Sequence, residues 1–435
     1  MKNEETLNFY WIIISSSFII LAFVYAIWYS FPIFFVALLE EFHWSRSTVS
    51  GAFSLFVIIH SIIGPFVGSM VDRFGPKRVI ILGSLFLGTG LGLCSLIQTW
   101  SQFYIFFGII TAIGVASAGW IPNTTLIQLW FKAKRGLAMG VVSSGIGIGI
   151  LVCVPSFQFL INRVGWRTTY NIVAILVTFV VISMAIIFLR KPSQLTQYDS
   201  EKDVSSTNIK DRLVANREWA SRIWTVRRAI TTKQFWLISF SYLLASFMAQ
   251  GILTHQVAFF VDQGLKTLFA SYIVGMVGLV SIGGKILWGT LSDKIGREVT
   301  YTLGIVCSIC GIIFLIIFGI SPSSILPYFY ALFFGMGYAV QAALPSLIAA
   351  DFFEGKTYGS IFGTLMIFHG LGGAFGAWFA GFVYDQMENY FPAFILMIAC
   401  AFFSCCSIWW AAPRKIKIVP GRRRRADVLV EVEPP

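Results

Sequence analysis

Apolar stretches of about twenty residues recur along nearly the whole chain, separated by short polar segments. A helix of about twenty residues crosses a hydrocarbon core of roughly 30 Å, so each stretch is long enough to span a bilayer. The pattern predicts an all-α membrane protein with twelve transmembrane helices, at residues 10–38, 48–71, 79–98, 102–130, 136–161, 168–189, 234–261, 268–291, 299–319, 325–350, 358–384 and 390–411.

One long polar segment, residues 190–233, divides six predicted spans from the other six. It is rich in Ser, Thr, Lys and Arg, which is typical of a solvated connection. We therefore expect an N-terminal six-helix bundle over 1–189, a cytoplasmic linker over 190–233, a C-terminal six-helix bundle over 234–411 and a basic cytoplasmic tail over 412–435.

The two halves carry an internal repeat. GSMVDRFG (68–75) and GTLSDKIG (289–296) share the pattern G-x-x-x-D-[RK]-x-G. Each position of the first copy is separated from its match in the second copy by the same number of residues, namely the number from Gly68 to Gly289. This separation is here called the repeat offset. The same offset relates further pairs, namely Gly114 with Gly335 and Phe131 with Phe352. A constant offset across much of a half predicts two pseudo-symmetric bundles.

The distribution of charge predicts the orientation of the chain in the membrane. The net charge is +12, yet only 12% of residues are charged, about half the share in soluble proteins. Nine basic residues lie in the loops on one side of the predicted membrane and four on the other; the nine are Arg73, Lys77, Arg78, Lys132, Lys134, Arg135, Lys294, Arg297 and Lys356. Because cytoplasmic loops are enriched in Lys and Arg, both termini are predicted to be cytoplasmic, with anionic lipid rather than nucleic acid as the partner.

Little in the sequence supports a metal site, a cofactor or an enzymatic activity. All seven cysteines fall in apolar spans, and Cys307-x-x-Cys310 has metal-ligand spacing but lies mid-span without a second pair. The sequence contains no nucleotide-binding loop and no nucleophile–base set. We therefore expect no metal, no cofactor and no enzymatic activity.

The repeated motif resembles the signature of the major facilitator superfamily, G-x-x-x-D-[RK]-x-G-x-[KR], between the second and third spans and again between the eighth and ninth. The resemblance covers essentially the whole chain. It implies alternating-access transport and a gating latch that helps to hold the outward-open state, formed by Gly68, Asp72, Arg73, Gly75, Lys77, Arg78, Gly289, Asp293, Lys294, Gly296 and Arg297.

Within that superfamily the chain resembles the monocarboxylate and oxalate–formate carriers. Residues 29–54 are similar to their first span and to the W-S-R that begins the second, and residues 381–390 to the end of their eleventh. Lys285 precedes Gly289 by four residues, where monocarboxylate carriers usually have arginine, and His369 takes the place of a lysine of the oxalate carriers. Drug exporters usually have an arginine in the fourth span and a Gly-Pro motif in the fifth, and this chain has neither.

Lys285 is the main candidate for chemistry. If Asp293 marks the interface, eight residues place Lys285 about 12 Å inside the membrane. A lysine there costs about 2.5–3.5 kcal/mol, so it should face a water-filled cavity or a partner. No carboxylate lies inside a predicted span, so the substrate's carboxylate is the predicted counter-ion. The alternative is that the long side chain snorkels to the cytoplasmic surface.

Histidines and aromatic residues complete the candidate set. His369 lies eleven residues into its predicted span and could donate to a carboxylate, carry a proton or bond a helix carbonyl. Together with Lys285, His369 and His255 are the proton-coupling candidates. Further substrate contacts are expected on the spans that line the cavity in this family, where each residue could equally pack between helices; they are Tyr29, Trp120, Asn123, Ser281 and Tyr338.

The sequence therefore predicts a secondary active transporter of a small organic anion of the lactate, pyruvate or formate type. It would work by alternating access, as a proton symporter or an anion exchanger. We expect a functional monomer in the plasma membrane, in bacteria the inner membrane. Two alternatives stay open. One is an exporter of drugs or other metabolites, and the other is a transport-like carboxylate sensor whose 190–233 loop, with Trp219, Ile223 and Trp224, binds a partner.

Overall fold

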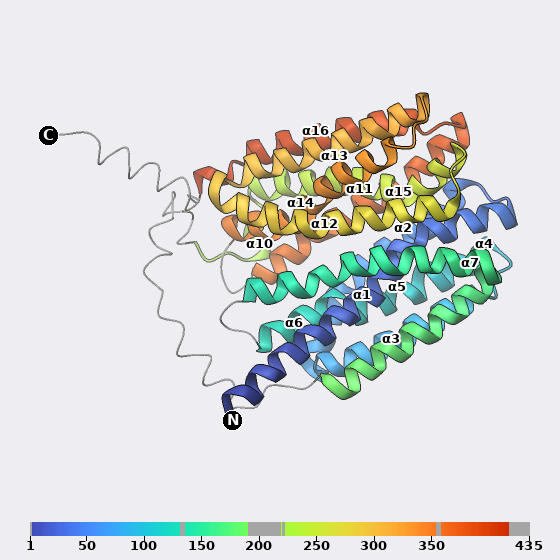
Figure 1. Cartoon of the computed structure of the whole chain (residues 1–435). Coiled ribbons are helices and arrows are strands. Elements are labelled where there is room, and N and C mark those ends of the chain that lie inside the picture. Colours follow the sequence, from blue (N-terminus) through green and yellow to red (C-terminus); the bar gives the residue numbers. More distant parts are fainter. Residues whose placement is uncertain (1, 131–134, 190–218, 220–221, 354–357, 417–435) are drawn as a thin grey trace. The chain divides into compact units, whose positions relative to one another are not determined.

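The computed structural model describes residues 2–130, 135–189, 219, 222–353 and 358–416 (Figure 1). Most of the predicted 190–233 linker and of the 412–435 tail lies outside these residues. So do Phe131, Lys132, Lys134 and Lys356, which contributed to the predicted repeat and orientation.

The described chain is built from helices, and no strand occurs among the described residues. The helices of the first half are α1 (Lys2–Phe42), α2 (Arg46–Phe74), α3 (Pro76–Cys94), α4 (Trp100–Phe103), the π-helix η1 (Tyr104–Thr111), α5 (Ala112–Ala118), α6 (Trp120–Trp130) and α7 (Arg135–Phe188). Those of the second half are α10 (Val226–Ala229), α11 (Lys233–Asp262), α12 (Thr267–Ile295), α13 (Arg297–Ile320), α14 (Leu326–Phe352), α15 (Tyr358–Met387), α16 (Phe391–Ala411) and the short η3 (Pro413–Lys415).

Eleven helical stretches within the described residues are long and apolar enough to cross a membrane. One of them lies in α7, which is too long for a single crossing, because the 54 residues of α7 would extend about 80 Å. Gly165 interrupts it with φ 78° and ψ 161°, a conformation that glycine adopts without a steric penalty. The break separates the predicted spans 136–161 and 168–189, so the prediction of twelve membrane helices is confirmed.

The described chain forms two compact units. The first contains Met1–Ser205, Gln250–Leu279 and Ala374–Tyr390, and the second contains Ser206–Ala249, Val280–Gly373 and Phe391–Pro435. The helices α11, α12 and α15 therefore each contribute to both units. The domain boundaries near 189 and 234 follow the sequence repeat and stay a prediction.

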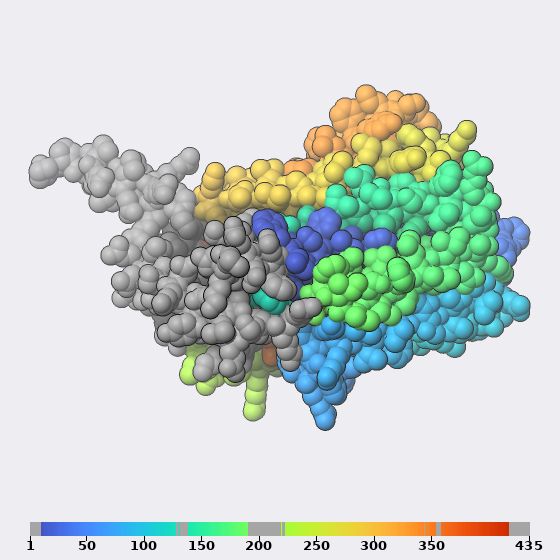
Figure 2. All heavy atoms as spheres, turned by 60° about the horizontal axis from the view of Figure 1, so that its bottom comes forward, coloured from blue at the N-terminus to red at the C-terminus, as the bar shows by residue number. Residues whose placement is uncertain are grey.

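The repeat extends to helix packing within each unit. On α3, a Cβ added to Gly83 would lie 2.6 Å from the Ala118 backbone nitrogen. Gly304 on α13 is related to Gly83 by the repeat offset, and a Cβ added there would lie 2.5 Å from Val340 Cβ. Small residues let membrane helices approach this closely. In the first unit, α3 also lies beside α7, and both present side chains on one face (Figure 2).

Replacing Gly83 with alanine is expected to destabilise the protein by about 1–3 kcal/mol, because the new methyl group collides with the α5 backbone. Gly92, on the same helix, has nothing within 4 Å of its added Cβ and provides the matched control. The midpoint of thermal unfolding in detergent should fall for Gly83→Ala and stay within error for Gly92→Ala. Equal midpoints would mean that the close approach does not contribute to stability.

Candidate functional site

Lys285 lies on the face of α12 that is turned away from the exposed apolar side chains. Leu279, Ile286 and Leu287 are 47%, 64% and 45% exposed and form the stripe that suits contact with lipid. At 100° per residue, Lys285 is at least about 100° of rotation from each of them. Trp288, close to Lys285 on the wheel, is buried and donates to the Met336 carbonyl on α14 at 2.7 Å. Lys285 itself is half-buried.

The carboxylates of the second unit are already paired with arginines. Arg297 binds Asp293 at 2.8 Å and Asp351 at 3.0 Å, and Glu298 binds Arg414 at 3.3 Å. These three are the acidic residues of that unit that the structure describes.

Among the described residues, the Lys285 ammonium makes no ion pair or hydrogen bond. The site thus presents an uncompensated cation on the interior face of α12. Such a group attracts anions, because low-dielectric surroundings strengthen a charge–charge attraction.

His369 lies on the interior side of α15. Its Nδ1 is 3.4 Å from the Ser246 hydroxyl on α11, while Leu371 and Phe375, on the other side of the helix, are 46% and 54% exposed. The tautomer decides which of the two atoms donates. His369 is half-buried, and its Nε2 has no hydrogen bond to a described residue.

The other predicted substrate contacts divide between the two units. Ser281, one turn before Lys285, is 1% exposed and belongs to the second unit with half-buried Tyr338 on α14. Tyr29 and Trp120 belong to the first unit, where Trp120 is 38% exposed at the start of α6. Within the second unit, the structure therefore holds Lys285, Ser281, Tyr338 and His369.

Asn123 supports a break in the backbone of the fourth span. Between α5 and α6, Gly119 leaves the helical conformation with φ −88° and ψ −128°. The Asn123 amide donates to the Ala118 and Gly119 carbonyls at 2.9 and 2.7 Å. The side-chain amide nitrogen of Asn123 is therefore already bonded to backbone carbonyls, and the amide oxygen has no partner among the described residues. The sequence analysis did not assign this structural task, although Pro122 is a signal for it, because a proline cannot donate to the carbonyl four residues before it, which here is that of Ala118.

His255 is committed to a hydrogen-bonded chain in the first unit. Its Nε2 lies 2.8 Å from the Ala377 carbonyl, so this nitrogen donates. Its Nδ1 then accepts from the Tyr390 hydroxyl at 3.0 Å, and that hydroxyl accepts from Arg46 at 2.6 Å. The ring is fully buried. A second proton on His255 would therefore displace the hydrogen bond that Nδ1 accepts from the Tyr390 hydroxyl. The role of His255 in proton coupling stays a prediction.

Arg46 organises an ionic cluster at the start of α2. Its guanidinium binds Asp262 at 2.7 Å and lies 3.6 Å from the centre of the Tyr384 ring. The backbone N–H groups of Arg46 and Ser47, at the start of α2, each donate to the Asp385 carboxylate at 2.8 Å. A carboxylate at a helix N-terminus satisfies free N–H groups and the helix dipole.

A sequence signal for this cluster existed in the repeat. Asp262 is related to Glu41 by the repeat offset, and Glu41 binds Arg167 at 2.9 Å. The two equivalent acids thus each bind an arginine. The identity of the arginine differs, which the offset alone does not predict.

The two copies of the gating motif differ. In the second, Asp293 and Asp351 hold Arg297, whose side chain is 11% exposed. In the first, Asp72 and Arg73 are exposed and make no hydrogen bond or ion pair to a described residue. Lys77 donates to the Ile186 carbonyl at 2.8 Å. Gly75 and Gly296 both have positive φ, 82° and 104°, at the same point of the motif.

Comparisons with known proteins agree on the family. The model of the Major Facilitator Superfamily matches residues 17–377. The chain is 24% identical over 421 residues to monocarboxylate transporter 13 of Rattus norvegicus, covering 94% of this chain and 93% of that protein. It is 28% identical over 316 residues to the fujikurins efflux protein of Gibberella fujikuroi, covering 71% and 60%.

Among solved structures, a bacterial homologue of the human lysosomal transporter Spinster, in an inward-facing and unoccupied conformation, has the same fold. The TM-score is 0.68 at 16% identity, and the alignment covers 94% of this chain and 98% of that one. The family match, the twelve membrane helices and the repeated motif lead to one conclusion: this chain belongs to the major facilitator superfamily and is a multi-pass integral membrane transporter.

Proposed function

We propose that this transporter carries a small monocarboxylate anion whose carboxylate binds Lys285. The observation that carries the proposal is the Lys285 ammonium on the interior face of α12, in a unit whose described acids are all bound to arginines. At 4 Å and an effective dielectric constant near 20, the attraction between the two charges is about 4 kcal/mol. The carboxylate of the substrate would then supply the counter-charge that the described residues do not.

The likeness to monocarboxylate transporter 13 supports this substrate class. Ser281 and Tyr338 would offer hydrogen bonds in the same unit as Lys285. Tyr29, Trp120 and Asn123 stay predicted substrate contacts. Alternating access of the two predicted six-helix bundles would expose the substrate to each side of the membrane in turn. The Asp293–Arg297–Asp351 cluster would act in the latch at the cytoplasmic end.

The bias of basic residues supports cytoplasmic termini. A plasma membrane, in bacteria the inner one, and a functional monomer stay predictions.

The direct test is uptake by the purified protein in liposomes, with labelled lactate, pyruvate, formate and oxalate as the panel. Saturable uptake of at least one monocarboxylate is expected. If all four acids leak at the rate of protein-free liposomes, the proposed substrate class is wrong.

Proton coupling is expected to depend on His369, since its Nε2 is the ring nitrogen available for a proton. With a pH gradient imposed, His369→Ala should lose most of the gradient-driven lactate uptake and retain exchange of external for internal lactate. The measurement compares the two modes in the same liposome preparation. Uptake that is driven by internal anion alone in the wild type would identify an exchanger and contradict proton coupling.

Export of a larger lipophilic compound is the second candidate, supported by the likeness to the fujikurins efflux protein. The partner-binding sensor has less support. Trp219 donates to the Phe352 carbonyl at 2.7 Å, and Trp224 packs against Phe353 at 5.1 Å between ring centres. These two tryptophans therefore contact the end of α14 in their own unit, whereas Ile223 is 77% exposed.

A further inference from the structure

The second unit exposes tryptophans at one end of two neighbouring helices. Trp236 lies one turn into α11 and is 53% exposed, and Trp410 lies at the end of α16 and is 76% exposed. The two helix ends lie at the same level, because the Ser407 hydroxyl on α16 donates to the Leu237 carbonyl on α11 at 2.7 Å. Tryptophan is enriched where membrane helices leave the hydrocarbon core, so this level is expected to be a membrane–water interface.

Basic residues follow directly beyond these tryptophans, before α11 and after α16. Each described acid of the second unit is bound to an arginine. The side chains of Arg227, Lys233 and Lys415 make no ion pair or hydrogen bond to a described residue. The exposed basic residues at this end, here called the basic surface, are Arg222, Arg227, Arg228, Lys233, Arg414 and Lys415.

The segment that contains α10 has two different sides. Trp224 and Ala229 are buried against the protein, whereas Arg227 and the apolar side chains of Ile223 and Ile230 are exposed. Cations and bulky apolar side chains on one outer side are typical of a segment that lies in the headgroup region of a bilayer. The cations would contact headgroups there, and the isoleucines would contact the start of the acyl chains.

The basic surface lies at the end of the second unit that carries the second gating motif. Glu298, at the start of α13 just after that motif, accepts from the Arg414 backbone N–H at 2.8 Å. The bias of basic residues predicts that this end faces the cytoplasm. Cytoplasmic leaflets contain anionic phospholipids, which attract Lys and Arg close to the membrane.

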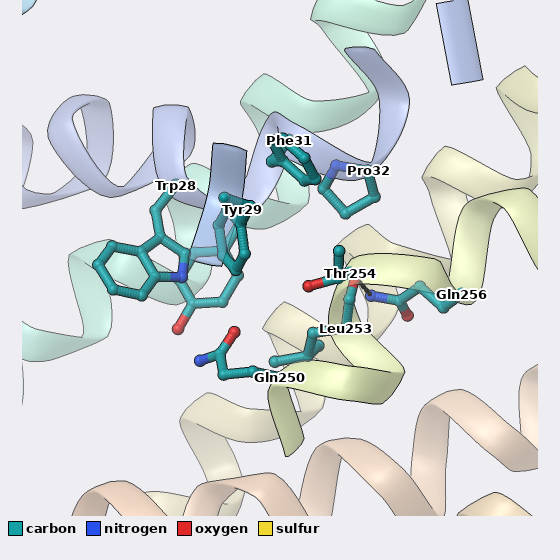
Figure 3. A pocket seen from close by; sticks show the side chains of 9 residues that line it. Trp28, Tyr29, Phe31, Pro32, Gln250, Leu253, Thr254 and Gln256 are labelled. Atoms are coloured by element: carbon teal, nitrogen blue, oxygen red, sulfur yellow. Dashed lines mark hydrogen bonds between the residues drawn. The ribbon is translucent and has the colours of Figure 1, made fainter. Parts of the chain in front are cut away.

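The small pocket of the first unit, between α1 and α11, has a lining of a different kind (Figure 3). Its polar residues include Trp28, Gln250 and Thr254, and none of its nine lining residues is charged. An anionic headgroup would find no counter-charge there, whereas the basic surface offers several cations.

We propose that the basic surface binds the phosphate of an anionic phospholipid headgroup. Arg227, Lys233 and Lys415 attract the phosphate, while Trp236 and Trp410 contact the lipid at the depth of its glycerol. The lipid stabilises the second unit at the end where α11 and α16 meet. The inference goes beyond the proposed function, since it does not depend on which substrate is carried.

Thermal unfolding of the purified protein in neutral detergent at low salt tests the proposal. Short-chain phosphatidylglycerol should raise the unfolding midpoint in a saturable manner. Phosphatidylcholine with the same chains should raise it less, because it has no net charge. Inorganic phosphate at the same concentrations should leave the midpoint unchanged, which separates a lipid headgroup from a free anion.

Two variants locate the effect. In the double variant Arg227→Gln/Lys233→Gln, the phosphatidylglycerol concentration that gives half of the shift should rise by about 25-fold, because each cation near anionic lipid contributes roughly fivefold in affinity. In Lys415→Gln it should rise about fivefold, so that misfolding of one variant does not end the experiment. Arg163→Gln/Lys266→Gln removes two exposed cations of the first unit and should titrate as the wild type does.

Three results would overturn the inference. Equal shifts with phosphatidylglycerol and phosphatidylcholine would mean that the charge of the headgroup is not recognised. A shift of the same size with inorganic phosphate would identify a site for free anions. Variants that unfold earlier without lipid but keep the wild-type response to phosphatidylglycerol would mean that these cations bind other parts of the chain.

Discussion

Lys285→Ala is expected to lower the initial rate of labelled lactate uptake into liposomes by about 30-fold or more. Removing one partner of a buried charge pair costs about 2–5 kcal/mol, and each 1.4 kcal/mol is a factor of ten. The loss should be large because the structure offers no second described cation in the same part of α12, where the neighbouring positions are Gly284, Ile286 and Trp288. The effect should appear for every monocarboxylate that the protein transports, since each would use its carboxylate here.

Two control variants separate charge from fold. Lys285→Arg keeps the charge and should retain part of the uptake, with an altered preference among the acids, since the planar guanidinium binds carboxylates in a different geometry. Lys266→Ala removes an exposed lysine in the loop before α12 and should transport as the wild type does. If Lys285→Ala is folded and transports as fast as Lys266→Ala, Lys285 does not bind the substrate.

Arg46→Ala is expected to lower the free energy of unfolding by about 1–3 kcal/mol, between the values for exposed and for buried ion pairs. The Arg46 side chain is 13% exposed and Asp262 is 27% exposed, so solvent screens the pair only in part. The variant also removes the donor to the Tyr390 hydroxyl, and with it one end of the chain that includes His255. The Asp385 contact should persist because it involves the backbone of residue 46.

Thermal unfolding in detergent measures this effect, with the midpoint expected to fall by several degrees. Arg163→Ala is the matched control, since Arg163 is exposed and its one contact with the described residues is with the Phe159 ring, at 5.3 Å. Equal midpoints for the two variants would show that the Arg46 cluster contributes nothing to stability.

The fold could be predicted almost entirely from the sequence, because the bilayer imposes a length and a polarity on every span. Even the glycine contacts between α3 and α5 and between α13 and α14 follow the repeat offset found in the motifs. The irregular course of the fourth span, with its π-helix at Tyr104–Thr111 and its break at Gly119, was not predicted. An apolar sequence is compatible with both helix types, so the choice between them comes from packing.

The candidate site was predictable in part. That a lysine inside a span needs an interior environment follows from the cost of burying a charge, and the exposed face of α12 agrees with it. The partners of the acids could not be derived, because Arg46 and Asp262 are 216 residues apart and Arg46 and Asp385 are 339 apart. Likewise, the sequence does not say that Asn123 turns its amide to the backbone or that Trp28, Gln250 and Thr254 converge.

Equilibrium binding of labelled lactate to the purified protein in detergent tests the central claim most directly, because it involves neither coupling nor orientation in a membrane. We predict saturable binding to the wild type, competed by other small monocarboxylates, and no saturable binding to Lys285→Gln, which keeps the approximate size of the side chain without its charge. Binding of equal affinity to both proteins would contradict the assignment of Lys285 as the anion site.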